Sequence, residues 1–354
     1  MKTLILNDLH LGVHRKGGTT PTSQEALRAY MFGSLREILN DTPAEHLIVN
    51  GDLFDRFSVD TRDLLETYAV FMVWLGLGKK LTLCSGNHDT VNRGDQVSSF
   101  SALGAVLTGA CPSLVVVVDI NQTAMVLPRV LAIPHQTNQD VLDGEFEKAL
   151  LRADEYDTLL LHCNLDNFHA QQSDLSLDLS DGVARRFEAA GVKILLAHEH
   201  DSRTVRNVTV LGCQLVSSIA DCVKSPAKFA HILEDGQIER VQTWSADGPN
   251  GYAQLDWRDL AGHDGQQSFL RVSGEAKSSE AAEVINAIAR FRQRSKAFVI
   301  SNAVAVDGIV SAEELPATFD AIKVFDVTSF VHNHLDEREK ATFDFLLAQV
   351  PSQA

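Results

Sequence analysis

The sequence has few cysteines, and none of them are close enough together to suggest a covalent framework. Its five cysteines contain no CxxC pair and lie far apart along a chain of 354 residues. This spacing argues against a disulfide-stapled fold and favours buried thiols in a reducing compartment. We therefore expect a cytoplasmic protein. The cysteines are Cys84, Cys111, Cys163, Cys213 and Cys222.

Long apolar runs and an excess of basic residues are also missing. No apolar stretch approaches the roughly 18 residues of a membrane span. The chain reaches its first acidic residue at Asp8, so we expect neither a signal peptide nor a membrane partner. Lys and Arg number 31 against 47 Asp and Glu, a net charge of −16. This charge argues against nucleic-acid binding through the whole surface, but a local basic groove or a metal-bearing site stays open.

What the sequence does contain is typical of a layered α/β domain with an appendage. Hydrophobic residues make up 45% of the chain, and we find no internal repeat. Short apolar runs, which predict strands, alternate with stretches of helical periodicity up to residue 247. Thr22 or Ser23 is a candidate cap for the first helix. The predicted strands lie at 2–7, 45–50, 79–85, 114–118, 123–127, 130–134, 157–162, 192–198, 204–211, 228–233 and 238–244, and the helices at 23–39, 62–78, 139–152 and 180–190.

A turn-rich stretch at 245–254 marks a candidate boundary. We therefore predict a domain over 1–247, a small β-α-β unit over 252–308 and a tail over 311–354. The tail contains a predicted helix at 334–350, which could bind a partner or pack on its own protein.

Polar side chains with metal-binding chemistry follow five of the predicted strands. In open α/β sheets, sites form at the carboxyl ends of strands, so these side chains should converge. One such residue alone is ordinarily a cap or a surface residue, but five strand ends together predict a metal site. The residues are Asp8 and His10, Asp52 and Asp55, Asn87 with His88 and Asp89, His162, and His198 with His200.

The spacing and chemistry of these residues favour two divalent cations. Residues two apart in an extended segment point the same way, so the D-x-H and H-x-H pairs can each reach one ion. Asp52 is the candidate bridge between two ions, because Gly51 beside it allows a tight turn. Oxygen and nitrogen ligands without thiolate suit Mn²⁺ above all, with Fe, Zn²⁺ or Mg²⁺ as alternatives.

The ordered series DLH, GDLFD, GNHD, His162 and HEH resembles the motifs of the calcineurin-like metallophosphoesterases, over about the first 200 residues. The resemblance implies a four-layer α/β/β/α core with a small C-terminal capping domain. It implies one ion held by Asp8, His10, Asp52 and His200, and a second held by Asp52, Asn87, His162 and His198. His88 matches the catalytic histidine of the family, and Asp89 matches the residue that orients it.

Within this superfamily, the closest resemblance is to the SbcD-type (Mre/SbcD) DNA nucleases, and the compact length would suit a phage-encoded member in the host cytoplasm. NDLHLG and GDLFD are similar to the motifs of that branch, and the second places Asp55 beside the metal ligands. His14 lies close to the first motif and could touch substrate, or it could be only a loop residue. The resemblance implies DNA ends or hairpins as substrate, an SbcC-like ABC ATPase partner and a homodimer. A basic run in the cap could contact DNA, although a solvated helix end, where basic residues also suit the helix dipole, is the favoured explanation. The run comprises Arg290, Arg292, Arg294 and Lys296.

Two departures from the family pattern, and two rival functions, remain. Ala197 stands where a glycine usually precedes H-x-H, and the stretch 212–223 departs from the expected Gly-Ser-Pro type. The first rival is a phosphodiesterase acting on small nucleotides. The second is a scaffold without catalysis, against which the intact ligand set argues.

Overall fold

Two six-stranded sheets form the centre of the computed structural model, which describes residues 1–13, 21–90, 96–167 and 176–307. The predicted tail helix at 334–350 lies outside these residues. The first sheet has the order β14-β13-β1-β2-β3-β4, with β1 to β4 parallel. Its strands are β1 (Thr3–Leu6), β2 (His46–Asn50), β3 (Lys80–Cys84), β4 (Val115–Val118), β13 (Ala227–Glu234) and β14 (Gln237–Ser245).

The second sheet has the order β11-β12-β10-β7-β6-β5, and its four central strands are also parallel. Its strands are β5 (Ala124–Leu127), β6 (Val130–Ile133), β7 (Thr158–His162), β10 (Lys193–Ala197), β11 (Arg203–Val205) and β12 (Val208–Val210). A short pair, β8 (Asn164–Leu165) with β9 (Asp178–Leu179), lies beside it.

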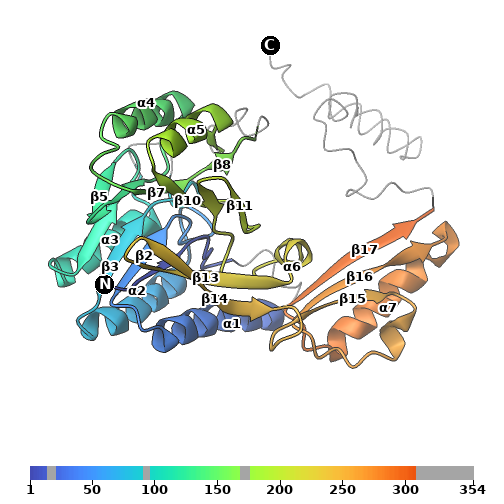
Figure 1. Cartoon of the computed structure of the whole chain (residues 1–354). Helices are drawn as coiled ribbons and strands as arrows, with labels where there is room; N and C mark the ends of the chain where they lie inside the picture. Colours follow the sequence, from blue (N-terminus) through green and yellow to red (C-terminus); the bar gives the residue numbers. More distant parts are fainter. Residues whose placement is uncertain (14–20, 91–95, 168–175, 308–354) are drawn as a thin grey trace, which may run out of the picture.

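Helices cover the outer face of each sheet (Figure 1). The first sheet packs against α1 (Pro21–Asp41), α2 (Thr61–Gly76) and α3 (Ser99–Ala110), and the second against α4 (Gln139–Leu150) and α5 (Asp181–Ala189). Between the sheets, Ile5 and Ile48 meet Leu160 and Leu195 in a separate apolar layer. The predicted α/β/β/α core is therefore confirmed.

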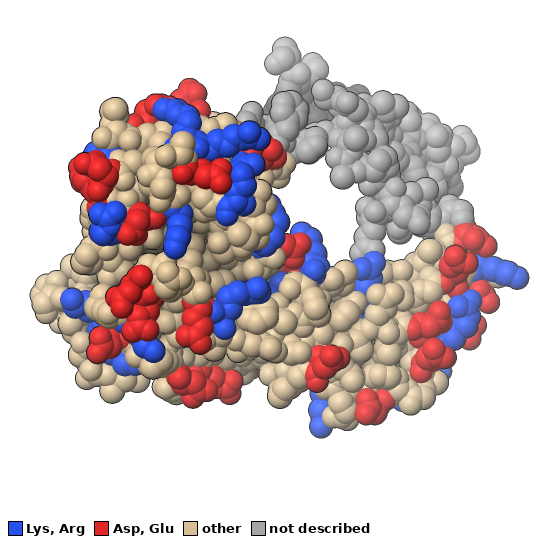
Figure 2. Space-filling model, viewed as in Figure 1, with Lys and Arg blue, Asp and Glu red and all other residues tan. Residues whose placement is uncertain are grey.

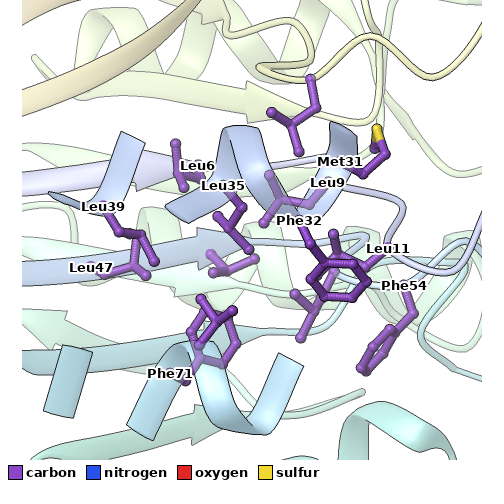
Figure 3. Packing of buried hydrophobic residues seen from close by; sticks show 14 of the residues in the cluster. Leu6, Leu9, Leu11, Met31, Phe32, Leu35, Leu39, Leu47, Phe54 and Phe71 are labelled. Carbon is purple, nitrogen blue, oxygen red and sulfur yellow. The ribbon is translucent and has the colours of Figure 1, made fainter. Parts of the chain in front are cut away.

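The buried face of α1 shows how the sequence pattern produces this packing. Leu27, Met31, Leu35 and Leu39 recur every fourth residue and are all buried. They lie against the first sheet together with Phe71 of α2 (Figure 3). Burying a side chain of this size stabilises the fold by about 1.5–3 kcal/mol.

Two local predictions about helices were wrong or incomplete. The first helix already begins at Pro21, so Thr22 and Ser23 are helical rather than caps; proline suits the first turn because its φ is preset. The sequence analysis also missed α3, whose small residues and two glycines give a weak helical signal. Ser98 caps α3 by accepting the Ser101 amide at 2.9 Å.

A three-stranded parallel sheet follows the core and corresponds to the predicted β-α-β unit, with one strand more. Its order is β15-β16-β17, and α7 packs on it. Its base joins the core where Tyr30 of α1 contacts the rings of Phe269 and Phe298. The elements are β15 (Tyr252–Asp256), η2 (Asp259–Ala261), β16 (Phe269–Ala276), η3 (Ser278–Glu280), α7 (Ala281–Arg294) and β17 (Val299–Val306). We call residues 252–307 the cap.

All five cysteines are free thiols, as their spacing predicted, and four of them are buried, whereas Cys111 is only partly buried. Among the described residues, no helix combines the length and apolarity that crossing a bilayer requires.

Candidate metal centre

The carboxyl ends of both sheets meet at one edge and bring the predicted site residues together. The first sheet contributes the segments that follow β1, β2 and β3, and the second contributes the ends of β7 and β10. Four of the predicted ligands have at most 4% of their surface exposed: Asp8, His10, Asp52 and His162.

The first group of potential ligands is Asp8, His10 and His200, whose donor atoms all lie within 4.8 Å of one another. The Nε2 atoms of His10 and His200 face each other at 3.2 Å. The Asp8 Oδ1 atom is buried and has no hydrogen-bond partner. A divalent cation would satisfy this carboxylate oxygen and both imidazole lone pairs, so the residues present fit a metal ion.

The second group is Asp52, His162 and His198, with donor atoms equally close. The Asn87 Oδ1 atom lies 3.0 Å from both His162 Nε2 and His198 Nδ1. His162 Nδ1 donates to the Asn50 carbonyl at 3.2 Å, which leaves its Nε2 facing the centre. This set of donors also fits a divalent cation.

Asp52 lies between the two groups. One of its oxygens, Oδ2, is 3.8 Å from His10 Nε2, and the other, Oδ1, is 3.3 Å from His162 Nε2. A carboxylate that presents one oxygen to each group has the geometry of a bridging ligand. The bridging role itself stays a prediction.

Strained backbone accompanies this convergence. Four predicted ligands have positive φ: Asp8 (49°), His10 (45°), Asp52 (49°) and His198 (93°). Each such residue costs about 1–2 kcal/mol, and strain of this kind clusters at functional sites. Ala197, by contrast, ends strand β10 without a positive φ, so alanine fits where the family pattern has glycine.

Two glycines permit the close approach of the loops. A Cβ atom at Gly51 would lie 2.0 Å from His162 Nδ1, and one at Gly86 would lie 2.1 Å from Asp52 Oδ1. Only glycine leaves room for these side chains.

Burial and charge determine the protonation of the centre. Burial lowers the pKa of His10 and of His198 to about 4, so both imidazoles are neutral and able to bind metal. Burial also opposes charge on His162, but the Asp52 carboxylate outweighs it and raises the pKa of His162 to about 9. Reciprocally, His162 holds the pKa of Asp52 below its usual range despite burial. Protons and cations therefore compete for the same atoms.

The His88 side chain is accessible to solvent, with 41% of its surface exposed. Its Nδ1 donates to the Asp55 carbonyl at 2.6 Å, and its Nε2 lies 4.0 Å from Asp52 Oδ2. The Asp55 side chain is also close, with Oδ1 3.9 Å from His10 Nδ1.

Asp89 does not hold the His88 ring, and that expectation was wrong. Its buried carboxylate accepts the amides of Leu53, Phe54 and Gly86 at 3.0–3.2 Å. Burial and the Asp52 charge raise the pKa of Asp89 to about 7, against these three bonds. Asp89 therefore ties the loop after β3 to the loop after β2, while the Asp55 carbonyl orients His88.

The sequence analysis missed Asp221, which lies beside the first group. Its Oδ1 accepts from His200 Nδ1 at 2.7 Å. Burial alone would raise the pKa of Asp221, but the bonds from His200 and two serines hold it well below its usual range. The only sequence signal is an acidic residue within an apolar stretch, which indicates a buried and partnered carboxylate.

The basic run of the cap does not form one free face. Arg292 donates to the Ile300 carbonyl, and Arg294 donates to the Leu260 and Ala261 carbonyls. Arg290 donates to the Asn286 carbonyl, and Lys296 is exposed. On the face drawn in Figure 2, acidic and basic side chains of the described residues are interleaved over core and cap. His14 lies outside the described residues.

The family model "Calcineurin-like phosphoesterase" matches residues 1–202, more than half of the chain. No curated protein sequence matches this chain.

Among solved structures, the chain is similar to an archaeal phosphodiesterase, with 15% identity over 68% of this chain and 99% of that one, at a TM-score of 0.32. It is also similar to a cold-active protein-tyrosine phosphatase of a psychrophilic Shewanella, with 15% identity over 69% of this chain and 80% of that one, at a TM-score of 0.33. It is similar as well to Pseudomonas putida nuclease MPE, with 16% identity over 68% of this chain and 87% of that one, at a TM-score of 0.25. Likenesses this weak identify no substrate.

Proposed function

This chain belongs to the calcineurin-like phosphoesterase family, and from that premise we propose that it is a phosphodiesterase that uses two divalent cations, with Mn²⁺ as the first choice. The proposal rests on one observation above all: the Asp52 carboxylate lies between two groups of potential ligands, with Oδ2 3.8 Å from His10 Nε2 and Oδ1 3.3 Å from His162 Nε2. Asp8, His10 and His200 would hold one ion, Asn87, His162 and His198 would hold the other, and Asp52 would be a ligand of both.

The cations, His88 and Asp89 have different roles in the proposed reaction. Divalent cations, when bound, supply positive charge for the anionic phosphodiester and lower the pKa of water. His88 donates its Nδ1 proton to the Asp55 carbonyl, so its Nε2 is the atom free to act on substrate. When the ring is doubly protonated, His88 can give its Nε2 proton to the departing oxygen and is left neutral with its Nδ1 proton, or its positive charge can stabilise that oxygen. Asp89 keeps the loop that bears His88 in place through its three amide bonds.

The proposed substrate is DNA, cleaved at ends or hairpins as by SbcD-type nucleases. The D-x-H-L-G and G-D-L-F-D motifs support this choice, as does a cap that follows the core. An SbcC-like ABC ATPase, a homodimer and a role in DNA repair or recombination in the cytoplasm belong to the same proposal. The arginines of α7 lend little support, because all three already donate to carbonyls of the cap.

A nuclease assay tests this proposal. Purified protein is mixed with linear double-stranded, single-stranded and hairpin DNA, with Mn²⁺ or Mg²⁺, beside His88→Ala and a chromogenic phosphodiester. We expect metal-dependent DNA cleavage that His88→Ala abolishes. Hydrolysis of the model diester with untouched DNA would contradict DNA as the substrate of the isolated chain and favour a small nucleotide. No hydrolysis of either would contradict the phosphodiesterase itself.

A further inference from the structure

His200 is held on both sides of its ring. Its Nε2 faces His10 Nε2 at 3.2 Å, on the side of the first ligand group. Its Nδ1 donates to Asp221 Oδ1 at 2.7 Å, a charge-assisted hydrogen bond. An imidazole that donates from Nδ1 to a carboxylate presents a more basic Nε2 lone pair in a fixed direction.

The Asp221 carboxylate is itself fixed by the loop before α6 (Ile219–Lys224). Its Oδ2 accepts the amides of Ser217 and Ser218 at 3.0 and 2.9 Å, and their hydroxyls at 3.2 and 2.8 Å. Asp221 is 3% exposed. Four donors on one oxygen leave the other, Oδ1, for His200, so the carboxylate cannot rotate without breaking several hydrogen bonds.

The backbone of His200 is anchored as well. Lys228 of β13 is buried and donates from Nζ to the His200 carbonyl at 3.2 Å. The side chain and the main chain of one residue are therefore fixed by two different elements, α6 and β13. Neither element contributes a ligand to either group, so both act on the centre through His200.

We infer that Asp221 is a positioning residue that orients His200 toward the first ion and so sets the affinity of that ion, while leaving the second ion unaffected. This inference rests on the proposed function, because it takes His200 as a ligand. It also connects the centre to the cap, since Ile219 and Cys222 of α6 pack in the same apolar cluster as Phe269 and Val299 of the cap.

The test measures Mn²⁺ binding to the full chain by calorimetry and by electron paramagnetic resonance, which distinguishes a coupled pair of ions from a single ion. Asp221→Asn replaces an acceptor oxygen with an amide that cannot accept all the donors around it. Ser218→Ala is the matched control, because it disturbs the same cap of α6 but leaves the His200–Asp221 bond. Asp221→Glu keeps the charge and moves it by one methylene. Thermal unfolding checks the fold of each variant.

We expect Asp221→Asn to lower the affinity for one of the two Mn²⁺ ions by about 10- to 100-fold, as loss of the hydrogen-bond partner of a ligating histidine does in other metal sites. The coupled-pair spectrum should then give way to that of a single ion at intermediate Mn²⁺ concentration. Asp221→Glu should restore part of the affinity. Ser218→Ala should weaken binding of the first ion far less than Asp221→Asn does, because Asp221 Oδ2 keeps three of its four donors and Oδ1 keeps its bond to His200.

Two outcomes would overturn the inference: unchanged affinity for both ions in Asp221→Asn, or equal weakening in Ser218→Ala. If Asp221→Asn does not fold, Mn²⁺ binding to Asp221→Glu is the test instead. If Asp221→Glu binds both ions with the parent affinities, the inference is overturned. The variant His200→Ala distinguishes failure of the inference about Asp221 from failure of the proposed function. If that variant still binds two ions with the parent affinities, His200 is no ligand, and the assignment of the centre itself is wrong.

Discussion

Replacing Gly51 by alanine tests the packing beneath the metal centre most directly. Gly51 follows β2 with φ +86°, and an added Cβ would lie 2.0 Å from Nδ1 and 2.5 Å from Cγ of the His162 ring. The positive φ costs about 1–2 kcal/mol for any residue with a Cβ. Displacing the buried ring adds about 1–3 kcal/mol, the usual range for overpacking. We therefore expect Gly51→Ala to lower the free energy of unfolding by about 2–5 kcal/mol.

Gly78 supplies a matched control. It has φ +74° and nothing within 4 Å of an added Cβ, so Gly78→Ala bears the conformational cost without the collision. Gly78→Ala should lower the free energy of unfolding by about 1 kcal/mol, because alanine also restricts the unfolded chain and so offsets part of the cost in the folded state. Urea unfolding in the presence of a chelator measures both variants without a contribution from bound metal.

The collision should also appear in metal binding. Displacing His162 moves its Nε2 away from Asp52 and Asn87, so Gly51→Ala should lower the affinity for the second Mn²⁺ ion. Gly78→Ala should leave the affinity for both ions unchanged. Calorimetric titration with Mn²⁺ measures this difference. If Gly51→Ala is no less stable than Gly78→Ala and binds both ions normally, the close approach of the β2 loop to His162 is refuted.

Three further predictions concern single residues. His88→Ala should abolish hydrolysis of a chromogenic phosphodiester while metal content stays unchanged; loss of metal would show that His88 is a ligand. Asp52→Ala should weaken both ions, because each of its oxygens faces one group, and an ion retained at the parent affinity in calorimetry would exclude the bridge. His46 is buried, and burial lowers its pKa to about 4, so protonation favours the unfolded chain. Stability should be complete above pH 6.5 and fall by up to about 3 kcal/mol as the pH drops to about 4. Urea unfolding across this range should show a flatter profile for His46→Gln, and an unchanged profile would exclude His46 as a source of the pH dependence.

Much of the site could be predicted from the sequence because its ligands follow apolar strands. Short apolar runs predicted the strands, and parallel strands place their carboxyl ends at one edge. The residues after β1, β2, β3, β7 and β10 therefore had to lie near one another once the strands formed two stacked sheets. The family resemblance then assigned Asp8, His10 and Asp52 to definite positions in the series.

The predictions that failed depended on where a side chain points. Asp89 follows His88 directly, and adjacency suggested that one orients the other. In the structure the Asp89 carboxylate turns inward to three amides, and a backbone carbonyl orients His88 instead. A backbone carbonyl leaves no mark in the sequence. The basic run of α7 also depends on where side chains point, since nearby carbonyls accept hydrogen bonds from Arg292 and Arg294, and contact of this run with DNA stays a prediction.

The sequence by itself determined the α/β class, the order of the strands along the chain and the set of potential ligands at their ends, because periodicity and residue chemistry are local properties. Only the tertiary structure decided that Asp52 presents one oxygen to each group, that Gly51 and Gly86 must lack side chains, and that Asp221 supports His200 from 21 residues away. Each of these depends on distances between segments that are remote in sequence. Such distances follow from the packing of the whole core, which no local pattern specifies.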